Sequence, residues 1–197
     1  MKSSDIMMIR AASDEVEINR NELAQRLGTA RGYSSELIES CREKLMKVIS
    51  YKCVYIRIPV QKPQENVCDF GFMRVGSRYL YNNLRDCDEA FAMALTSGIA
   101  VDRELAKLRV ISQAEHFVTD ALASAAIDSF ADYAVSKMSN GLQCVPRFSP
   151  GYGDFSLEFQ KPFLERLNGH GLLGITLSSA YLMTPVKSIT AIMGIKK

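Results

Sequence analysis

The segment 147–154 gathers side chains that could bind a small charged ligand; it reads Arg-Phe-Ser-Pro-Gly-Tyr-Gly-Asp. Arg147 can hold a carboxylate through two parallel hydrogen bonds, and Tyr152 offers both a ring face and a hydroxyl. Pro150 and Gly151 fit the central positions of a type II turn, which would expose backbone amides to a ligand. From these residues alone, a ligand-binding loop and a purely structural loop both remain open.

Other motifs give little support to an enzyme active site. The two histidines, His116 and His170, and the scattered cysteines form no set with metal-ligand spacing. Residues 169–174 match the letters of the dinucleotide fingerprint GxGxxG, but a helix is expected before them and a strand after them. No acidic residue follows before the chain ends. We interpret this segment as a flexible turn.

The composition is that of an ordinary globular protein. The chain has 197 residues, of which 47% are hydrophobic and 23% are charged, so we expect one unit with a substantial core. The net charge is only +2 without a basic run, which argues against nucleic-acid and membrane-surface binding. The apolar run 6–9 is too short for a signal peptide. The most apolar region, 171–195, is interrupted by polar residues that a membrane-spanning helix would tolerate poorly. Five dispersed cysteines indicate reduced thiols, and we expect a cytoplasmic protein.

The elements that must position the loop are predicted from hydrophobic periodicity and helix-capping signals. Residues 1–15 are expected to be aperiodic and frayed. Asn19 and Glu22 resemble a capping box at the start of a helix. Strands are predicted at 16–18, 54–60, 67–73, 173–177 and 189–195. Helices are predicted at 19–28, 35–49, 77–84, 88–96 and 157–167, and a longer helical region that allows for breaks at 102–138.

This order of elements predicts the fold class. Strands and helices come in clusters rather than in regular alternation, which favours an α+β fold with a mostly antiparallel, twisted sheet flanked by helices. Residues 121–126 are unusually small and would let another backbone or a ligand approach closely. Close packing is the simpler interpretation of that run.

The loop also carries a family resemblance. Its Arg-x-x-Pro-Gly-Tyr motif resembles the hallmark of the activation domain of cobalamin-dependent methionine synthase, the module that binds S-adenosylmethionine (AdoMet). The run 121–133 is similar to the acidic helix before the loop in that family, and 182–188 looks like its C-terminal strand–turn–strand segment. The resemblance is clearest over 88–197 and weaker over 1–87. It implies a single activation-domain-like unit over 1–197, as a freestanding protein.

The resemblance implies a set of ligand-binding residues. Arg147 would bind the AdoMet carboxylate, and Asp128 would match the family's acidic helix residue and bind a cationic group. Tyr152 would lie beside the sulfonium, and the loop amides would meet the remaining polar atoms. From the residues alone, Asp128 would be a solvated helix carboxylate. The implied AdoMet site comprises Asp128, Arg147, Ser149, Gly151 and Tyr152.

Three positions depart from the family pattern. Gly153 stands where the family usually has proline, and an aromatic ligand residue of the last strand aligns with Met193. An acidic contact from the family's N-terminal region has no clear counterpart, and Asp69 is the candidate. These differences leave open a module that docks on a corrinoid protein without using AdoMet.

The chain lacks the Asp-x-His-x-x-Gly signature with which methionine synthases ligate cobalamin. The resemblance therefore implies that the cobalamin belongs to a partner, either a cobalamin-dependent methionine synthase or a related corrinoid methyltransferase. The implied role is reductive remethylation of cob(II)alamin, with AdoMet as methyl donor and flavodoxin or another reductase as electron donor. The alternatives are a non-catalytic docking or protective module, reactivation of a different corrinoid protein, and a general interaction protein.

Overall fold

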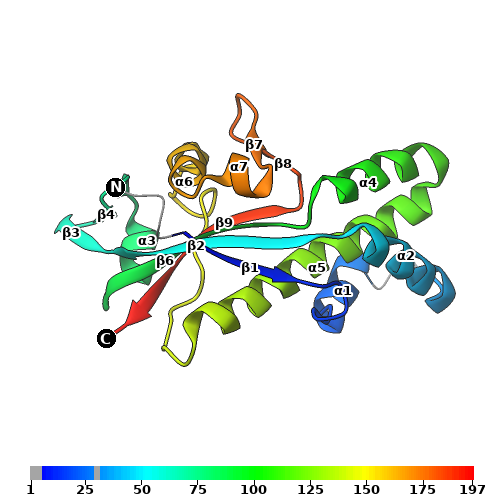
Figure 1. Ribbon diagram of the computed structural model, residues 1–197, viewed down its shortest axis with the longest axis horizontal. Helices are drawn as coiled ribbons and strands as arrows, with labels where there is room; N and C mark the ends of the chain where they lie inside the picture. Colours follow the sequence, from blue (N-terminus) through cyan, green and yellow to red (C-terminus); the bar gives the residue numbers. More distant parts are fainter. Residues whose placement is uncertain (1–5, 29–31) are drawn as a thin grey trace.

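The protein is built around a four-stranded antiparallel sheet. The computed structural model describes residues 6–28 and 32–197, and Figure 1 shows the sheet at the centre of the molecule. Its strand order is β1-β2-β6-β9, and every neighbouring pair is antiparallel. The strands are β1 (Met7–Ala11), β2 (Tyr51–Pro59), β6 (Cys87–Thr96) and β9 (Ser188–Lys196). The predicted α+β fold with an antiparallel sheet is confirmed.

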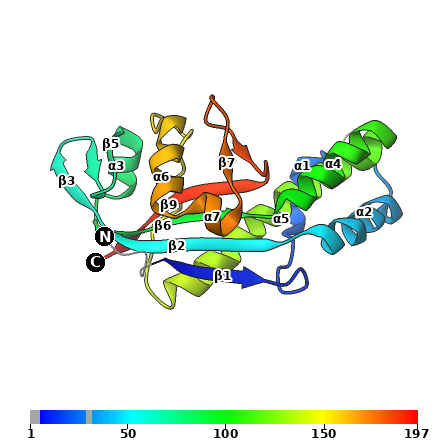
Figure 2. The same ribbon diagram turned by 45° about the horizontal axis from the view of Figure 1, so that its top comes forward.

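One face of this sheet packs against the longer helices. Tyr51 and Cys53 of β2 and Met93 of β6 point into a core that these helices share. Figure 1 shows α5 crossing one side of the sheet, and Figure 2 shows α2 and α4 reaching beyond the ends of β1 and β2. The helices are α1 (Arg20–Leu27), α2 (Ser35–Val48), α4 (Ile99–Ile111) and α5 (Gln113–Ser139).

The other face carries smaller elements. Val54, Ile56 and Ile58 of β2 point into this second core, as their alternation predicted. Figure 1 shows α6 and α7 on this side of the sheet, opposite α5. The elements are β3 (Gln61–Gln64), β4 (Val67–Asp69), β5 (Arg74–Gly76), α3 (Arg78–Asn83), α6 (Gln160–Arg166), α7 (Gly169–Leu173), β7 (Thr176–Leu177) and β8 (Met183–Thr184), with a 3₁₀ turn at Leu157–Phe159.

The small residues of α5 serve close packing. Ala123, Ala125 and Ala126 are completely buried in the core that α5 shares with the sheet. Phe130, one turn further along, stacks on Tyr51 of β2 with ring centroids 4.7 Å apart. Short side chains let α5 lie close to the strands, so the simpler interpretation of residues 121–126 is confirmed.

The largest error of sequence reasoning concerns residues 88–96, which form the central strand β6 instead of a helix. Ala90, Ala92 and Ala94 face one core, while Phe91 and Met93 face the other. A strand that is buried on both faces has a continuous apolar sequence without alternation. The alanines, which favour helices intrinsically, made the helical prediction attractive.

Several smaller predictions are also wrong. The described part of residues 1–15 contains strand β1, whereas 16–18 are not a strand, although Val16 and Ile18 are buried. The helical region predicted over 102–138 starts earlier, at Ile99; the prediction allowed for breaks, and the region is divided at Ser112 into α4 and α5. The predicted turn at 169–174 contains the short helix α7.

The capping predictions fared better. Asn19 and Ser34 cap α1 and α2 through their side chains, and Gly28 ends α1. The capping box is incomplete, because the Asn19 amide donates to Ser129 Oγ on α5, at 3.0 Å, rather than to Glu22.

In the described part of the chain, no helix combines the length and the apolar character that crossing a membrane requires.

Candidate functional site

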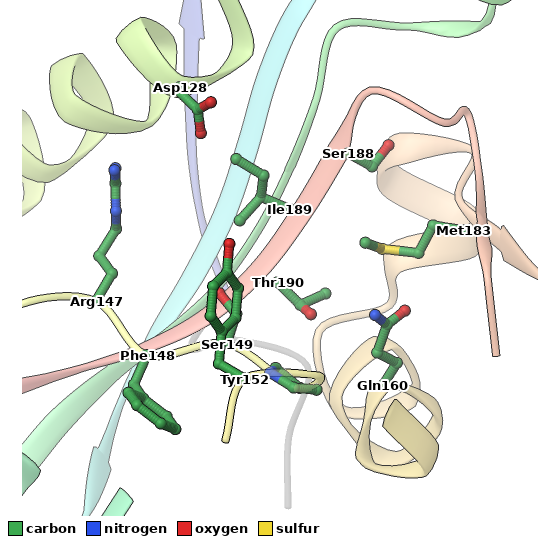
Figure 3. A pocket seen from close by; sticks show the side chains of 11 residues that line it. Asp128, Arg147, Phe148, Ser149, Tyr152, Gln160, Met183, Ser188, Ile189 and Thr190 are labelled. Atoms are coloured by element: carbon green, nitrogen blue, oxygen red, sulfur yellow. The ribbon is translucent and has the colours of Figure 1, made fainter. Parts of the chain in front are cut away.

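A pocket of about 420 Å³ opens beside β9, between α5, the 147–154 loop and α6 (Figure 3). This volume lies within the range of about 300–1,000 Å³ that small-molecule sites commonly have. The lining combines charged, neutral polar and apolar side chains: Asp128, Arg147, Phe148, Ser149, Pro150, Tyr152, Gln160, Met183, Ser188, Ile189 and Thr190.

The outer edge of β9 creates the pocket. Phe148 exchanges two backbone hydrogen bonds with Ile192, and Val145 donates to Gly194, so the loop covers this stretch of the edge. After Phe148 the chain turns away at Pro150. The start of β9, residues 188–190, then lines the pocket.

The turn of the loop has the predicted form. Tyr152 N donates to the Ser149 carbonyl at 3.2 Å, and Gly151 has a φ of +95°, as the third position of a type II turn requires. A Cβ on Gly151 would also lie 2.9 Å from a methyl carbon of Leu157. Gly151 is therefore needed for the shape of the loop, and it is not among the residues that line the pocket.

The expectation that the loop amides would meet a ligand is wrong for two of them. Gly151 N donates to the Phe155 carbonyl at 2.6 Å, and Tyr152 N is bonded within the turn. Asp154 anchors the loop elsewhere, because its carboxylate accepts hydrogen bonds from the Ser77 hydroxyl and from the amides of Arg78 and Tyr79. The loop is thus fastened to the start of α3.

Arg147 forms one charged side of the pocket. Its side chain is 24% exposed, and Nη2 lies 2.9 Å from the carboxylate of Asp132. Its Nη1 is buried without a hydrogen-bond partner. A guanidinium has five N–H donors, so Arg147 keeps donor capacity for an anionic group inside the pocket.

Asp128, on α5, lies near Arg147 of the loop. Figure 3 shows both on the same side of the pocket. Its carboxylate lies 2.6 Å from Nη2 of Arg26 on α1. Burial, together with a hydrogen bond to Glu22 and the charge of that residue, raises the pKa of Asp128 to about 6, although Arg26 and Arg147 oppose the shift. Asp128 is therefore partly enclosed and holds a cation in this structure.

Sequence reasoning missed the participation of α1. Glu22 and Arg26 are one helical turn apart and form an ion pair of 2.8 Å. This spacing is ordinary for a surface helix, so nothing in the sequence connected the pair to Asp128. Asp69, the N-terminal candidate, instead accepts hydrogen bonds from Arg74 and from the Gly71 amide on the small sheet, outside the pocket.

Gln160 and Thr190 form the neutral polar side of the pocket. Gln160 on α6 is 6% exposed, and Thr190 on β9 is 2% exposed. Gln160 Oε1 and Thr190 Oγ1 are both buried without a hydrogen-bond partner. Unpartnered buried polar atoms are rare in folded proteins, so two that line one pocket mark positions where a ligand can bind. The predicted site included neither residue.

The remaining predicted positions are placed as follows. Ser149 and Tyr152 line the pocket, and Tyr152 is 68% exposed at its mouth. Figure 3 shows its ring standing between the Arg147 and Gln160 sides. Met193 is buried in the core against α5 and does not line the pocket.

Gly153 occupies a position that excludes proline. Its φ is +57°, whereas a proline ring fixes φ near −65°. A Cβ there would also lie 2.8 Å from the ring of Tyr79. The departure from the family motif is therefore a local difference in backbone conformation and in packing against α3.

Comparisons with known proteins establish the fold. No protein-family model and no curated protein sequence matches this chain. Among solved structures, the crystal structure of the MetH reactivation domain bound to AdoHcy is similar, with a TM-score of 0.70. The two share 13% sequence identity, and the match covers 96% of this chain and 78% of that chain. This chain therefore has the fold of the MetH reactivation domain, as the motif resemblance implied.

Proposed function

We propose that this protein binds AdoMet in the pocket beside β9 and supports reductive remethylation of cob(II)alamin held by a separate protein. The observation that carries the proposal is that Arg147 and Asp128 both line one side of the pocket, within a fold shared with a domain bound to AdoHcy. AdoMet has a carboxylate that Arg147 can bind, and it has an ammonium and a sulfonium, either of which Asp128 can bind.

The residues of the pocket fit such a ligand. The buried, unpartnered Nη1 of Arg147 can donate to the carboxylate, which makes a charge-assisted hydrogen bond. Asp128 already holds the Arg26 guanidinium, so it can accept a ligand cation in its place. The exposed ring of Tyr152 lies at the mouth, where a cation can rest against an aromatic face.

AdoMet supplies a methyl group that is already activated by its sulfonium. In the net reaction, cob(II)alamin receives this methyl group from AdoMet and one electron from an external donor of the flavodoxin type. It leaves methylcobalamin on the partner and the neutral thioether S-adenosylhomocysteine on this protein. The chain needs no general acid or base; its residues orient the ligand and complement its charges.

Loss of the sulfonium charge helps product release. Asp128 lines the pocket and Glu22 lies beside it, so the negative charge here favours a cationic ligand. The thioether product keeps the ammonium and the carboxylate but loses one positive charge. We therefore expect the product to bind more weakly than AdoMet, which favours turnover.

A remethylation assay tests the proposal. A purified corrinoid methyltransferase with its cofactor as cob(II)alamin would be mixed with this protein, a one-electron reductant and AdoMet labelled in the methyl group. Label on the corrinoid that depends on this protein and is lost with Arg147→Ala supports the proposal. Binding of the partner without methyl transfer would favour a docking or protective module instead.

A further inference from the structure

We propose that Gln160 recognises the adenine of the ligand and that Thr190 supplies a second neutral contact to the nucleoside. This inference rests on the proposed function and concerns the part of the pocket that Arg147 and Asp128 do not explain. Figure 3 shows Gln160 and Thr190 on the side of the pocket away from Arg147. A ligand with a charged amino-acid end and a neutral nucleoside end fits this division.

Gln160 has the hydrogen-bonding groups that an adenine edge requires. A glutamine amide carries a donor and an acceptor side by side, and it can pair in two places with N6 and N7 of adenine. Gln160 Oε1 is buried without a partner, and the side chain is held on the pocket-facing side of α6 with 6% exposure. A buried amide at the pocket wall favours a ligand edge that offers a donor and an acceptor in matching positions.

Thr190 contributes more than its hydroxyl. Ile192 turns both its backbone N–H and its C=O outward to Phe148. Backbone groups alternate in direction along a strand, so the N–H and C=O of Thr190 point to the same open edge of β9. The edge of the sheet therefore presents a donor and an acceptor beside the unpartnered hydroxyl oxygen.

An apolar side chain completes this half of the pocket. Met183 on β8 lines it, whereas Ile189 on β9 packs against the core on the α5 side of the strand. A thioether makes favourable contacts with aromatic rings, so Met183 can pack against the base. The charged groups of the pocket, Asp128 and Arg147, lie on the other side in Figure 3.

The test compares two ligands on three proteins. S-Adenosylhomocysteine and its inosine analogue, in which an oxo group replaces the 6-amino group, would be titrated calorimetrically into the wild type, Gln160→Met and Gln143→Met. Gln143 is an exposed glutamine that does not line the pocket, so it provides the matched control. We expect the wild type and the control to prefer the adenine ligand by about tenfold, and Gln160→Met to lose this preference.

Thermal unfolding separates recognition from a structural role. Gln160 makes no hydrogen bond through Oε1, so Gln160→Met should keep the melting temperature of the wild type while losing the ligand preference. A preference that survives in Gln160→Met would overturn the inference and leave the proposed function standing. If the wild type binds neither S-adenosylhomocysteine nor AdoMet, the proposed function fails first, and the inference fails with it.

Discussion

The two sides of the pocket differ in how far their polar groups are satisfied. On the charged side, Asp128 is paired with Arg26, and Arg147 is paired with Asp132. On the neutral side, Gln160 Oε1 and Thr190 Oγ1 have no partner. A ligand cation must therefore displace or share the ion pair of Asp128, whereas the ligand gains new hydrogen bonds from Gln160, Thr190 and the unpartnered Nη1 of Arg147.

This difference assigns different tasks to the two sides. At Asp128, exchange of the Arg26 ion pair for a ligand cation changes little free energy, so this residue selects for charge and makes binding depend on pH and salt. Arg147 contributes more, because its unpartnered Nη1 gains a charge-assisted hydrogen bond. A buried acceptor that gains its first hydrogen bond contributes more directly, and it rejects ligands that lack the donor.

Arg147→Ala should have the largest effect. It removes the only cationic side chain that lines the pocket in the described part of the chain, and a hydrogen bond between charged groups is worth up to about 3 kcal/mol. We expect AdoMet affinity to fall by about a hundredfold in calorimetric titrations. Arg74→Ala removes an arginine that pairs with Asp69 outside the pocket, and it should bind as the wild type does. Equal losses in both variants would point to a nonspecific charge effect.

Protonation of Asp128 should weaken AdoMet binding by about tenfold between pH 7 and pH 5. Burial and the neighbouring Glu22 raise the pKa of Asp128 to about 6, so the carboxylate loses its charge as the pH falls through this value. Binding curves measured across this range should show the loss for the wild type. Asp128→Asn should bind weakly at every pH, and a matching pH dependence in that variant would assign the titration to another group.

The same protonation should act on stability with the opposite sign. Because the pKa of Asp128 is higher in the folded protein than in the unfolded chain, the folded protein takes up this proton first as the pH falls. Acidification from pH 7 to pH 5 should therefore favour the folded wild type relative to Asp128→Asn. Denaturant unfolding of both proteins at the two pH values measures this difference. A wild type that loses more stability than the variant would contradict the account.

Arg26→Ala should strengthen AdoMet binding by about threefold. The Arg26 guanidinium lies 2.6 Å from the Asp128 carboxylate, and a ligand cation must compete with it. The gain is small because a partly exposed ion pair is worth about 0–1 kcal/mol. Arg42→Ala removes an arginine from a comparable pair with Glu39 on α2 and should leave binding unchanged. Weaker binding by Arg26→Ala would mean that Arg26 itself contacts the ligand.

Thr190→Val should have the smallest effect on stability, because its hydroxyl oxygen has no partner to lose. Thr96 is equally buried on the neighbouring strand, but its Oγ1 accepts hydrogen bonds from Gly98 N and Ser188 Oγ. We expect Thr96→Val to lower the free energy of unfolding by about 1–3 kcal/mol and Thr190→Val to change it by less than about 0.5 kcal/mol. Denaturant unfolding compares the two, and equal losses would show that Thr190 has a structural bond.

The sequence predicted the pocket loop well and its surroundings poorly. Arg147, Ser149 and Tyr152 lie close together in the sequence, so a local motif was enough to find them. Gln160 and Thr190 belong to different elements, and only the packing of α6 against β9 brings them to one pocket. Neither residue type suggests a ligand in isolation, because buried glutamine and threonine commonly bond within the protein.

The fold shows the same contrast. Periodicity found β2, β9 and the caps of α1 and α2, since these depend on alternation or on residues next to one another. The strand β6 was taken for a helix because burial on both faces removes the alternation that marks a strand. The strand β1 was missed because five residues at a sheet edge carry too little pattern.

One calorimetric experiment tests whether a single AdoMet molecule spans both sides of the pocket. AdoMet would be titrated into the wild type, Arg147→Ala, Gln160→Met and the double variant, after thermal unfolding has shown that all four are folded. We expect one binding site in the wild type, a loss of affinity of at least about tenfold in each single variant, and no measurable binding in the double variant. A wild type that does not bind AdoMet, or a double variant that binds as well as the wild type, would contradict this expectation.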